Sequence, residues 1–385
     1  MRKGWEYKKL GEVCTIKAGY TPQKNELSDN GAYPYYKVAD MNTLGNDVYL
    51  DITSSYKIDA NKLFPKGAIV FPKNGAAVST NKKRILKYDS IVDLNTGVAI
   101  FPKSINEKFA YYWFIDTDFK KYVRGGALPT LDIKSLKDKP FPSIDKSIQL
   151  AIVSELDKIN ELIRLKKEQL KDFGNLAQSL FYEMFGDPVE NEKGWEVKKL
   201  NEIVSDNCSI SYGIVQPGDG VENGVPVVRP VDMTKTFVSR KGLKNTTKEI
   251  SDSYKRTILK GNEILMCVRG TTGLISMATP ELQGCNVTRG IAPIECGPTC
   301  DKWFVFYQIL NPAIQHHIAE YTRGIALKQI NMKDVRDIPL CLPPLSLQRL
   351  FAQRIEQIER EKSEVQKSIQ NLETLLASRM QYWFE

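Results

Sequence analysis

Two stretches of the chain carry an apolar residue alternately every four and every three positions. In residues 147–185 and 346–385 this spacing continues for more than four heptads. Such a period keeps one side of a helix apolar and is typical of a coiled coil. The predicted seam comprises Ile152, Leu156, Ile159, Ile163, Leu170, Phe173, Ala177, Leu180 and Met184, and then Phe351, Ile355, Ile358, Val365, Ile369, Leu372, Leu376 and Trp383, with Lys166, Lys362 and Arg379 as its polar members.

The stretches 1–146 and 186–345 show a different pattern. Short apolar runs bounded by Gly, Pro or Asn predict strands near 68–71, 90–92, 97–101, 263–268 and 290–292. One helix is predicted near 107–123 and one near 302–322, each followed by a Gly-containing loop and a short helix capped by Asp132 or Asn331. The expected fold class is α+β, with two mixed α/β domains and two long helices that form an antiparallel coiled coil.

The chain contains an internal repeat. KGWEYKKLGEV (3–13) and KGWEVKKLNEI (193–203) agree at eight of eleven positions, and LDIKSLKDKP (131–140) corresponds to INMKDVRDIP (330–339). The offset grows from 190 to 199 between these motifs and then stays constant, so that Gln149 matches Gln348. The order domain–helix–domain–helix predicts a pseudo-two-fold molecule whose helices pair with each other. Formation of a homodimer through either helix is the alternative.

Composition and charge narrow the class of protein. The 385 residues include 54 Lys and Arg and 46 Asp and Glu, and residues 1–146 alone hold 24 basic and 16 acidic residues. This excess in the first domain favours an anionic partner such as nucleic acid. The chain has no run of 18 apolar residues, no apolar leader and seven scattered cysteines. These features predict a cytoplasmic protein with reduced thiols.

Motifs of catalysis and cofactor binding are missing from the sequence. It lacks G-x-x-x-x-G-K-[ST], G-x-G-x-x-G after a strand, H-E-x-x-H and G-x-S-x-G. His316 and His317 fall inside a predicted helix, Cys285, Cys296 and Cys300 lack a fourth zinc ligand, and Asn311-Pro312 is expected to break a helix. We therefore expect a recognition or assembly subunit without cofactor or metal, rather than an enzyme.

The layout, the KGWE-x-KKL opening of each copy and the exit Phe185-Gly186-Asp187-Pro188 resemble the specificity (S) subunit of Type I restriction–modification systems. The resemblance covers essentially the whole chain. It implies two target recognition domains that each read half of a bipartite DNA sequence, and helices that set the spacer. It also implies two partner methyltransferase subunits that use S-adenosylmethionine to methylate adenine at N6. Two restriction subunits, which use ATP and magnesium, join in complexes that also cleave DNA.

Loops between the matched strands are the expected DNA-reading segments, because binding loops sit on rigid frames. The candidates are Lys37, Lys73, Asn74, Thr80, Asn81, Lys82, Lys83, Arg84 and Arg124 in the first domain, and Arg229, Arg269, Thr271, Thr272, Arg289, Arg323 and Lys328 in the second. Trp5 and Trp195 are expected to pack within the scaffold. The competing hypothesis is a coiled-coil scaffold that joins proteins without reading DNA. The divergence of the two domains beside constant helices favours DNA reading.

Overall fold

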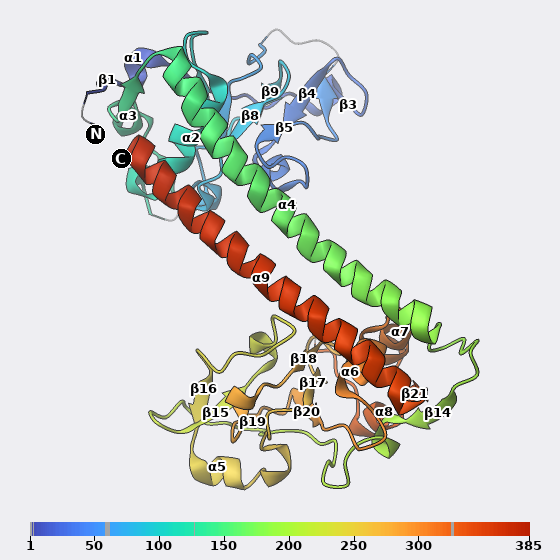
Figure 1. The fold of residues 1–385 in the computed structure, drawn as a ribbon. Helices are drawn as coiled ribbons and strands as arrows, with labels where there is room; N and C mark the ends of the chain where they lie inside the picture. The colour runs from blue at the N-terminus through green and yellow to red at the C-terminus, as the bar shows by residue number, and fades with distance from the viewer. Residues whose placement is uncertain (1, 3, 58–61, 127, 325–326) are drawn as a thin grey trace. The chain divides into compact units, whose positions relative to one another are not determined.

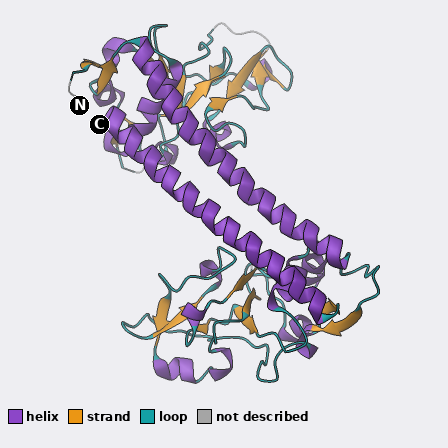
Figure 2. Ribbon diagram, viewed as in Figure 1, coloured by secondary structure: helices purple, strands orange, loops and turns teal. Residues whose placement is uncertain are grey.

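The structure, a computed structural model, describes residues 2, 4–57, 62–126, 128–324 and 327–385. It divides into two compact units, Met1–Lys167 with Lys367–Glu385, and Glu168–Gln366. Each unit combines a mixed α/β domain with parts of two 40-residue helices, α4 (Lys146–Phe185) and α9 (Leu345–Phe384) (Figures 1 and 2). The predicted α+β class with two long helices is confirmed.

The domain of the first unit is built on a five-stranded sheet of order β2-β10-β7-β8-β5 and a four-stranded sheet of order β3-β6-β4-β9. Two short antiparallel pairs, β1–β13 and β11–β12, complete it. Its elements are β1 (Glu6–Lys9), α1 (Leu10–Val13), β2 (Thr15–Ala18), β3 (Leu27–Ser28), β4 (Tyr33–Tyr36), β5 (Tyr49–Leu50), β6 (Tyr56–Lys57), β7 (Ile69–Pro72), β8 (Arg84–Leu86), β9 (Ile91–Val92), β10 (Thr96–Ile100), α2 (Glu107–Asp116), β11 (Val123–Arg124), β12 (Thr130–Leu131), α3 (Ile133–Lys137) and β13 (Pro140–Ser143).

The domain of the second unit has two three-stranded sheets, of order β18-β17-β20 and β16-β15-β19, and the antiparallel pair β14–β21. Its elements are β14 (Glu196–Lys199), β15 (Val225–Val228), β16 (Lys244–Thr246), α5 (Lys248–Asp252), β17 (Ile264–Cys267), β18 (Ile275–Met277), β19 (Asn286–Val287), β20 (Ile291–Ile294), α6 (Lys302–Leu310), α7 (Pro312–Glu320), α8 (Met332–Arg336) and β21 (Pro339–Leu342).

The sequence repeat corresponds to a repeated scaffold. In both units the strand after KGWE pairs with the strand before a long helix, β1 with β13 and β14 with β21. A salt bridge ties the same two motifs together in each copy, Lys9 to Asp138 at 2.9 Å and Lys199 to Asp337 at 2.8 Å. Both domains also hold an antiparallel pair at their centre (β7–β10, β17–β20) and a matching parallel pair (β4–β9, β15–β19), and the first domain has a further parallel pair, β5–β8.

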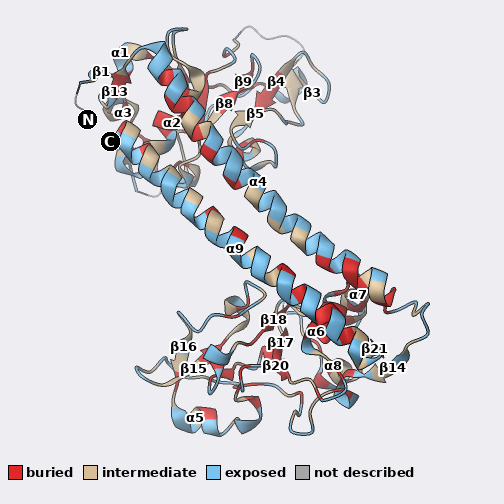
Figure 3. Ribbon diagram, in the orientation of Figure 1, coloured by how far each residue is buried: buried red, intermediate tan, exposed pale blue. Residues whose placement is uncertain are grey.

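The long helices pack through the predicted seam. Its positions are buried or half-buried, whereas most residues between them are exposed (Figure 3). In the first unit, Glu155 of α4 pairs with Arg379 of α9, and Lys167 pairs with Glu373 at 3.0 Å. Residue numbers rise along α4 while they fall along α9, so the two helices run antiparallel there.

In the second unit, the same helices meet through aromatic rings. The rings of Phe181 and Phe185 lie 5.7 and 5.3 Å from that of Phe351. The end of α4 therefore packs beside the beginning of α9, which again makes the pair antiparallel. These residues belong to one apolar core with Leu180 and Ile355.

Three expectations about the helices need correction. The helix expected near 107–123 ends at Asp116, because Thr117 is extended and the Asp118 side chain caps a separate 3-10 turn. The helix expected near 302–322 is two helices, and the break lies at Asn311-Pro312 as predicted, since Pro312 lacks the N–H that would continue the first. Asp132 caps its short helix as predicted, but the Asn331 side chain makes no capping hydrogen bond.

Candidate DNA interface

In the first unit, loops from separate parts of the chain meet at one edge of the sheets. Strands β4 and β9 are parallel, so the residues after them are adjacent, and Asp93 N donates to Tyr36 O at 3.0 Å. The loop after β7 joins them through Lys73 N, which donates to Asn95 O at 2.8 Å. The β11–β12 hairpin completes the set. We call residues 37, 73–75, 93–95, 124 and 129–130 the first loop cluster.

The second unit has the same arrangement with different side chains. Thr288 N donates to Val228 O at 2.9 Å after the parallel strands β15 and β19, and Val268 N donates to Gly290 O at 2.8 Å after β17. Residues 229, 268–272, 288–290, 323 and 328–329 form the second loop cluster. The backbone hydrogen bonds match those of the first cluster, so the two clusters occupy one place in one scaffold.

Glycines with positive φ shape the two loops of each cluster that lie against each other. Gly75 (φ 76°) and Gly270 (φ 90°) follow β7 and β17, and each donates its N–H across to the other loop at 2.8 Å. Gly324 has φ 103°, and a Cβ there would lie 2.3 Å from Leu327 O. Only glycine therefore suits that turn without strain.

Four predicted residues of the first domain lie in the first loop cluster. Lys37 is exposed, whereas Lys73 and Asn74 are half-buried. The Asn74 amide donates to Asn95 Oδ1 at 3.4 Å. The exposed guanidinium of Arg124 pairs with the carboxylate of Asp132, the cap of α3. These side chains can reach a ligand at the edge of the sheets.

The basic stretch 80–84 is not the open surface that the sequence suggested. Lys83 is fully buried, its ammonium donates to Thr117 O at 2.7 Å, and it lies 4.1 Å from the centre of the Phe119 ring. Burial lowers the pKa of Lys83 to about 7. Because no part of Lys83 reaches the surface, it cannot contact DNA in this conformation, and the expectation for it is wrong.

The neighbours of Lys83 hold loops together. The guanidinium of Arg84 donates to the carbonyl oxygens of Met41 (2.9 Å) and Asn46, and Lys82 donates to the side chain of Asn42. Asn81 Oδ1 accepts from Phe119 N at 2.9 Å. Thr80 is exposed and donates to Ala77 O at 2.6 Å. The hydrogen-bonding groups of this stretch are therefore largely used inside the protein.

The second loop cluster gathers more free cations. Arg289, Arg323 and Lys328 are exposed and Arg269 is half-buried. Within the described part of the chain, none of these four side chains takes part in an ion pair or hydrogen bond. Thr271 is exposed, and Thr272 Oγ1 lies 3.0 Å from that of Thr322.

Arg229 of the second loop cluster is held by an acid. Its guanidinium makes two hydrogen bonds to Asp232, at 3.0 and 2.8 Å, which raise the pKa of Arg229. The charge excess of the sequence lies in the first domain, yet among the described residues the second loop cluster holds more unpaired cations than the first. Lys82, Lys83 and Arg84 of the first domain make internal contacts instead.

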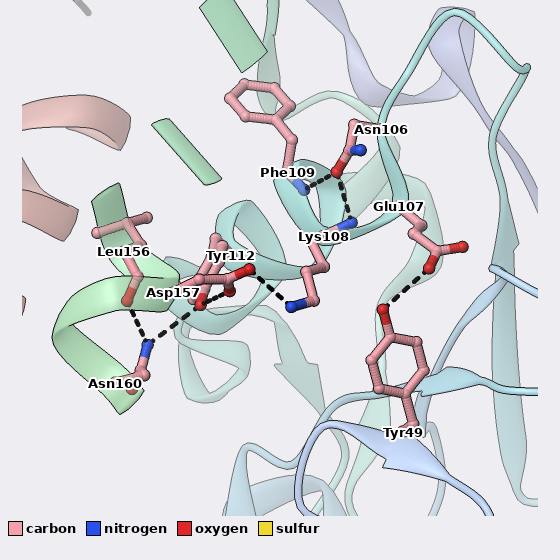
Figure 4. A network of polar contacts seen from close by, with 9 residues as sticks. All are labelled: Tyr49, Asn106, Glu107, Lys108, Phe109, Tyr112, Leu156, Asp157 and Asn160. Carbon is pink, nitrogen blue, oxygen red and sulfur yellow. Dashed lines mark hydrogen bonds and ion pairs between the residues drawn. The ribbon is translucent and has the colours of Figure 1, made fainter. Parts of the chain in front are cut away.

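Polar contacts fasten the first domain to α4 (Figure 4). Lys108 and Tyr112 of α2 both donate to the Asp157 carboxylate, at 2.7 and 2.6 Å, and Asn160 donates to the Tyr112 hydroxyl at 3.1 Å. Asn106 caps the start of α2. In the second unit Tyr307 lies 3.4 Å from Glu359 in the same way. These hydrogen bonds thus attach each domain to a long helix.

Gln149 and Gln348, which occupy matching positions in the repeat, make a second set of contacts between domain and helix. Gln149 is buried, accepts from Asn106 N at 2.8 Å and donates to Ile144 O at 2.9 Å. Gln348 does the same with Asp301 N (2.8 Å) and Pro343 O (2.7 Å). A buried side-chain amide with both ends bonded fixes the angle at which domain and helix meet.

The tryptophans of the KGWE motifs pack against the ends of the long helices, as expected. Trp5 stacks on Trp383 of α9 with ring centres 6.0 Å apart, and Trp195 Nε1 donates to Phe185 O of α4 at 2.9 Å. His316 lies 3.4 Å from Glu320 on α7.

Neither a metal-binding group nor a membrane-spanning helix occurs among the described residues. No group of three His, Cys, Asp or Glu side chains there is placed to hold a metal ion. No helix in that part of the chain has the length and apolar character needed to cross a membrane.

Known proteins are similar to this chain in sequence. The chain is 27% identical over 178 residues to the specificity subunit of the Type I restriction enzyme EcoBI from Escherichia coli, which covers 46% of this chain and 37% of that subunit. It is 24% identical over 395 residues to the MjaIX specificity subunit of Methanocaldococcus jannaschii, covering 91% and 85% of the two chains.

Solved structures show the same fold. The S subunit of a Type I restriction–modification system from M. genitalium matches with a TM-score of 0.54 and 15% identity, over 99% of this chain and 96% of that one. A chain solved for complex assembly and conformational transition of the type I R-M system matches with a TM-score of 0.62 and 19% identity, over 100% and 98%.

The family model of the Type I restriction modification DNA specificity domain matches the chain twice, over residues 2–172 and 192–374. These two matches follow the two copies of the repeat and include both loop clusters. The chain therefore belongs to the family of Type I restriction–modification DNA specificity proteins.

Proposed function

We propose that the chain reads a bipartite DNA target, with one half-site for each loop cluster. The observation that carries this is the pair of clusters. They share a scaffold and its backbone hydrogen bonds, but they present different side chains. A scaffold that only joined proteins would have no need for this difference. Basic and amide side chains on the loops suit phosphates and base edges.

The chain's role in a complex is the supply of specificity. Its relatives are named as specificity subunits of Type I restriction enzymes. We infer that partner subunits carry the chemistry, namely N6-adenine methylation with S-adenosylmethionine and, where restriction subunits are present, DNA cleavage with ATP and magnesium. In this proposal the chain itself contributes no catalytic residue and no cofactor.

A salt titration tests whether the second loop cluster meets DNA. Replacing Arg289 and Lys328 by alanine removes two unpaired cations. We expect weaker binding of the full chain to a mixed-sequence duplex. The slope of log K against log salt should become shallower by about 1.8, because two fewer counterions are released.

The matched control is Arg240→Ala with Lys241→Ala. These residues are exposed in the same unit, and Arg240 donates to Glu281 O beside the opposite end of β17. This variant loses the same charge and should keep most of the slope. Equal slopes for the two double variants would remove the second loop cluster from the DNA interface.

A further inference from the structure

Three polar side chains form a row across the second loop cluster. Arg269 is opposite Gln329, and Gln329 is opposite Arg323, in antiparallel bridges. Arg323 and Gln329 exchange both backbone hydrogen bonds at 2.8 Å. Residues directly opposite each other in an antiparallel ladder point to the same face. Arg269, Gln329 and Arg323 therefore stand side by side; we call them the second row.

The second row faces away from the core. Val268, which precedes Arg269, and Ile330, which follows Gln329, are buried with exposed fractions of 0% and 1%, whereas Lys328 near the end of the hairpin is exposed. Successive residues of a strand point to opposite faces, so the row points outward. The side chains of Arg269 and Arg323 have no partner within the described residues, and Gln329 makes one long bond to the Tyr212 hydroxyl at 3.5 Å. The three polar groups are available to a ligand.

The first unit has the same row with other residues. Asn74 is opposite Thr130, and Thr130 is opposite Arg124, so this first row reads Asn–Thr–Arg where the second reads Arg–Gln–Arg. The charge of its arginine is compensated by Asp132. In the repeat alignment, the uncharged Asn331 replaces Asp132. The second row thus presents two uncompensated guanidinium groups and the first row presents none.

We propose that the second row reads guanine bases in the major groove of its half-site, an inference that rests on the proposed function. Arginine forms a bidentate pair with the O6 and N7 atoms of guanine, and glutamine does so with adenine. Adjacent ladder positions are about 4.5 to 5.5 Å apart, so the outer arginines are separated by about 10 Å. That span corresponds to about three base-pair steps. The half-site of the second unit then contains two guanines within about four successive base pairs.

The sharpest test converts one row into the other. The variant Arg269→Asn with Gln329→Thr gives the second unit the side chains of the first row and leaves Arg323 in place. The full complex with its adenine methyltransferase is expressed in a methylation-free host, and methylated sites are mapped by sequencing. We expect one half-site to lose a guanine preference by about 10- to 100-fold and the other to stay unchanged. Arg240→Ala serves as control and should leave both half-sites as they are.

A modified DNA provides a readout that does not depend on variant folding. The wild-type complex is given duplexes with 7-deazaguanine, which lacks N7, in place of guanine in one half-site or in the spacer. The methylation rate should fall about tenfold or more when the guanines of one half-site are replaced, and should be unchanged when only those of the spacer are replaced.

The outcomes separate the two proposals. Methylation without any bipartite motif overturns the proposed function, and the row assignment with it. If a bipartite motif is found but neither half-site responds to the row exchange, the row assignment alone is overturned. The row assignment is also overturned if the responding half-site has no neighbouring guanines, or if methylation tolerates their replacement by 7-deazaguanine.

Discussion

Lys83 shows how a single residue can mislead a prediction based on local polarity. It belongs to the run Asn81-Lys82-Lys83-Arg84, which is typical of an exposed basic loop. In the fold it directly precedes β8, two positions before the buried Ile85, and it is buried in the same way. Continuing the β7–β8 register by one residue places Lys83 opposite Phe71, and in the second unit Ile275 lies opposite Met266 at the matching place. The alternation of inward and outward residues along β8 could have predicted that Lys83 is buried. The charged residues around it instead suggested an exposed loop.

The variant Lys83→Met should stabilise the first unit. Burial lowers the folded-state pKa of Lys83 to about 7, from an ordinary value of 10.5. Between those pH values the unfolded chain binds the proton and the folded chain does not, so this lysine opposes folding increasingly as pH falls. The cost is absent above about pH 10.5 and complete below about pH 7, where it reaches roughly 5 kcal/mol.

Thermal unfolding from pH 7 to pH 10 measures this effect. The difference in Tm between Lys83→Met and wild type should narrow steadily as pH rises. The exposed substitution Lys103→Met should give a small difference that does not vary with pH. A Lys83→Met difference independent of pH would mean that this lysine remains charged in its pocket.

At the level of elements, the long helices were the most predictable part of the chain. Their seam repeats within a few residues, and a helix begins and ends on local signals such as Pro344 and Gly186. Strand pairing joins residues far apart in the sequence, and only the fold shows it. The row Arg269–Gln329–Arg323 depends on such a register. The sequence therefore indicated Arg269 and Arg323 as candidates, but it did not show that Gln329 lies between them.

The seam should carry much of the stability of each unit. Leu156 and Ile355 are fully buried, in the cores of the first and second units. Replacing either by alanine should lower the free energy of unfolding of its own unit by about 2 to 5 kcal/mol. Leu162 on the same α4 helix is 48% exposed, and its replacement by alanine should cost about 0.5 kcal/mol or less.

Hydrogen exchange of backbone amides assigns these losses to one unit or the other. Protection should fall for Leu156→Ala in the first unit and for Ile355→Ala in the second. Equal losses for Leu156→Ala and Leu162→Ala would contradict the packing of α4 through its seam.

For the whole molecule, the repeat explains how one chain can recognise two different sequences. The contacts that repeat, such as the two salt bridges from the KGWE-x-KKL motifs and the matched glutamines, build the scaffold. The loop clusters, which rest on this scaffold, present different side chains in the two copies. This division could be predicted from the sequence because motifs of the scaffold are matched while the loops drift in length. Which loop residues meet at one edge required the structure.

The central claim is tested most directly by the pattern of methylation that the chain directs. The chain is co-expressed with the adenine methyltransferase of its own genome in a methylation-free host, and N6-methyladenine is mapped by modification-sensitive sequencing. We predict methylation at a single motif of two dissimilar half-sites with a fixed spacer. A soluble complex that carries S-adenosylmethionine but methylates no such motif would contradict the account.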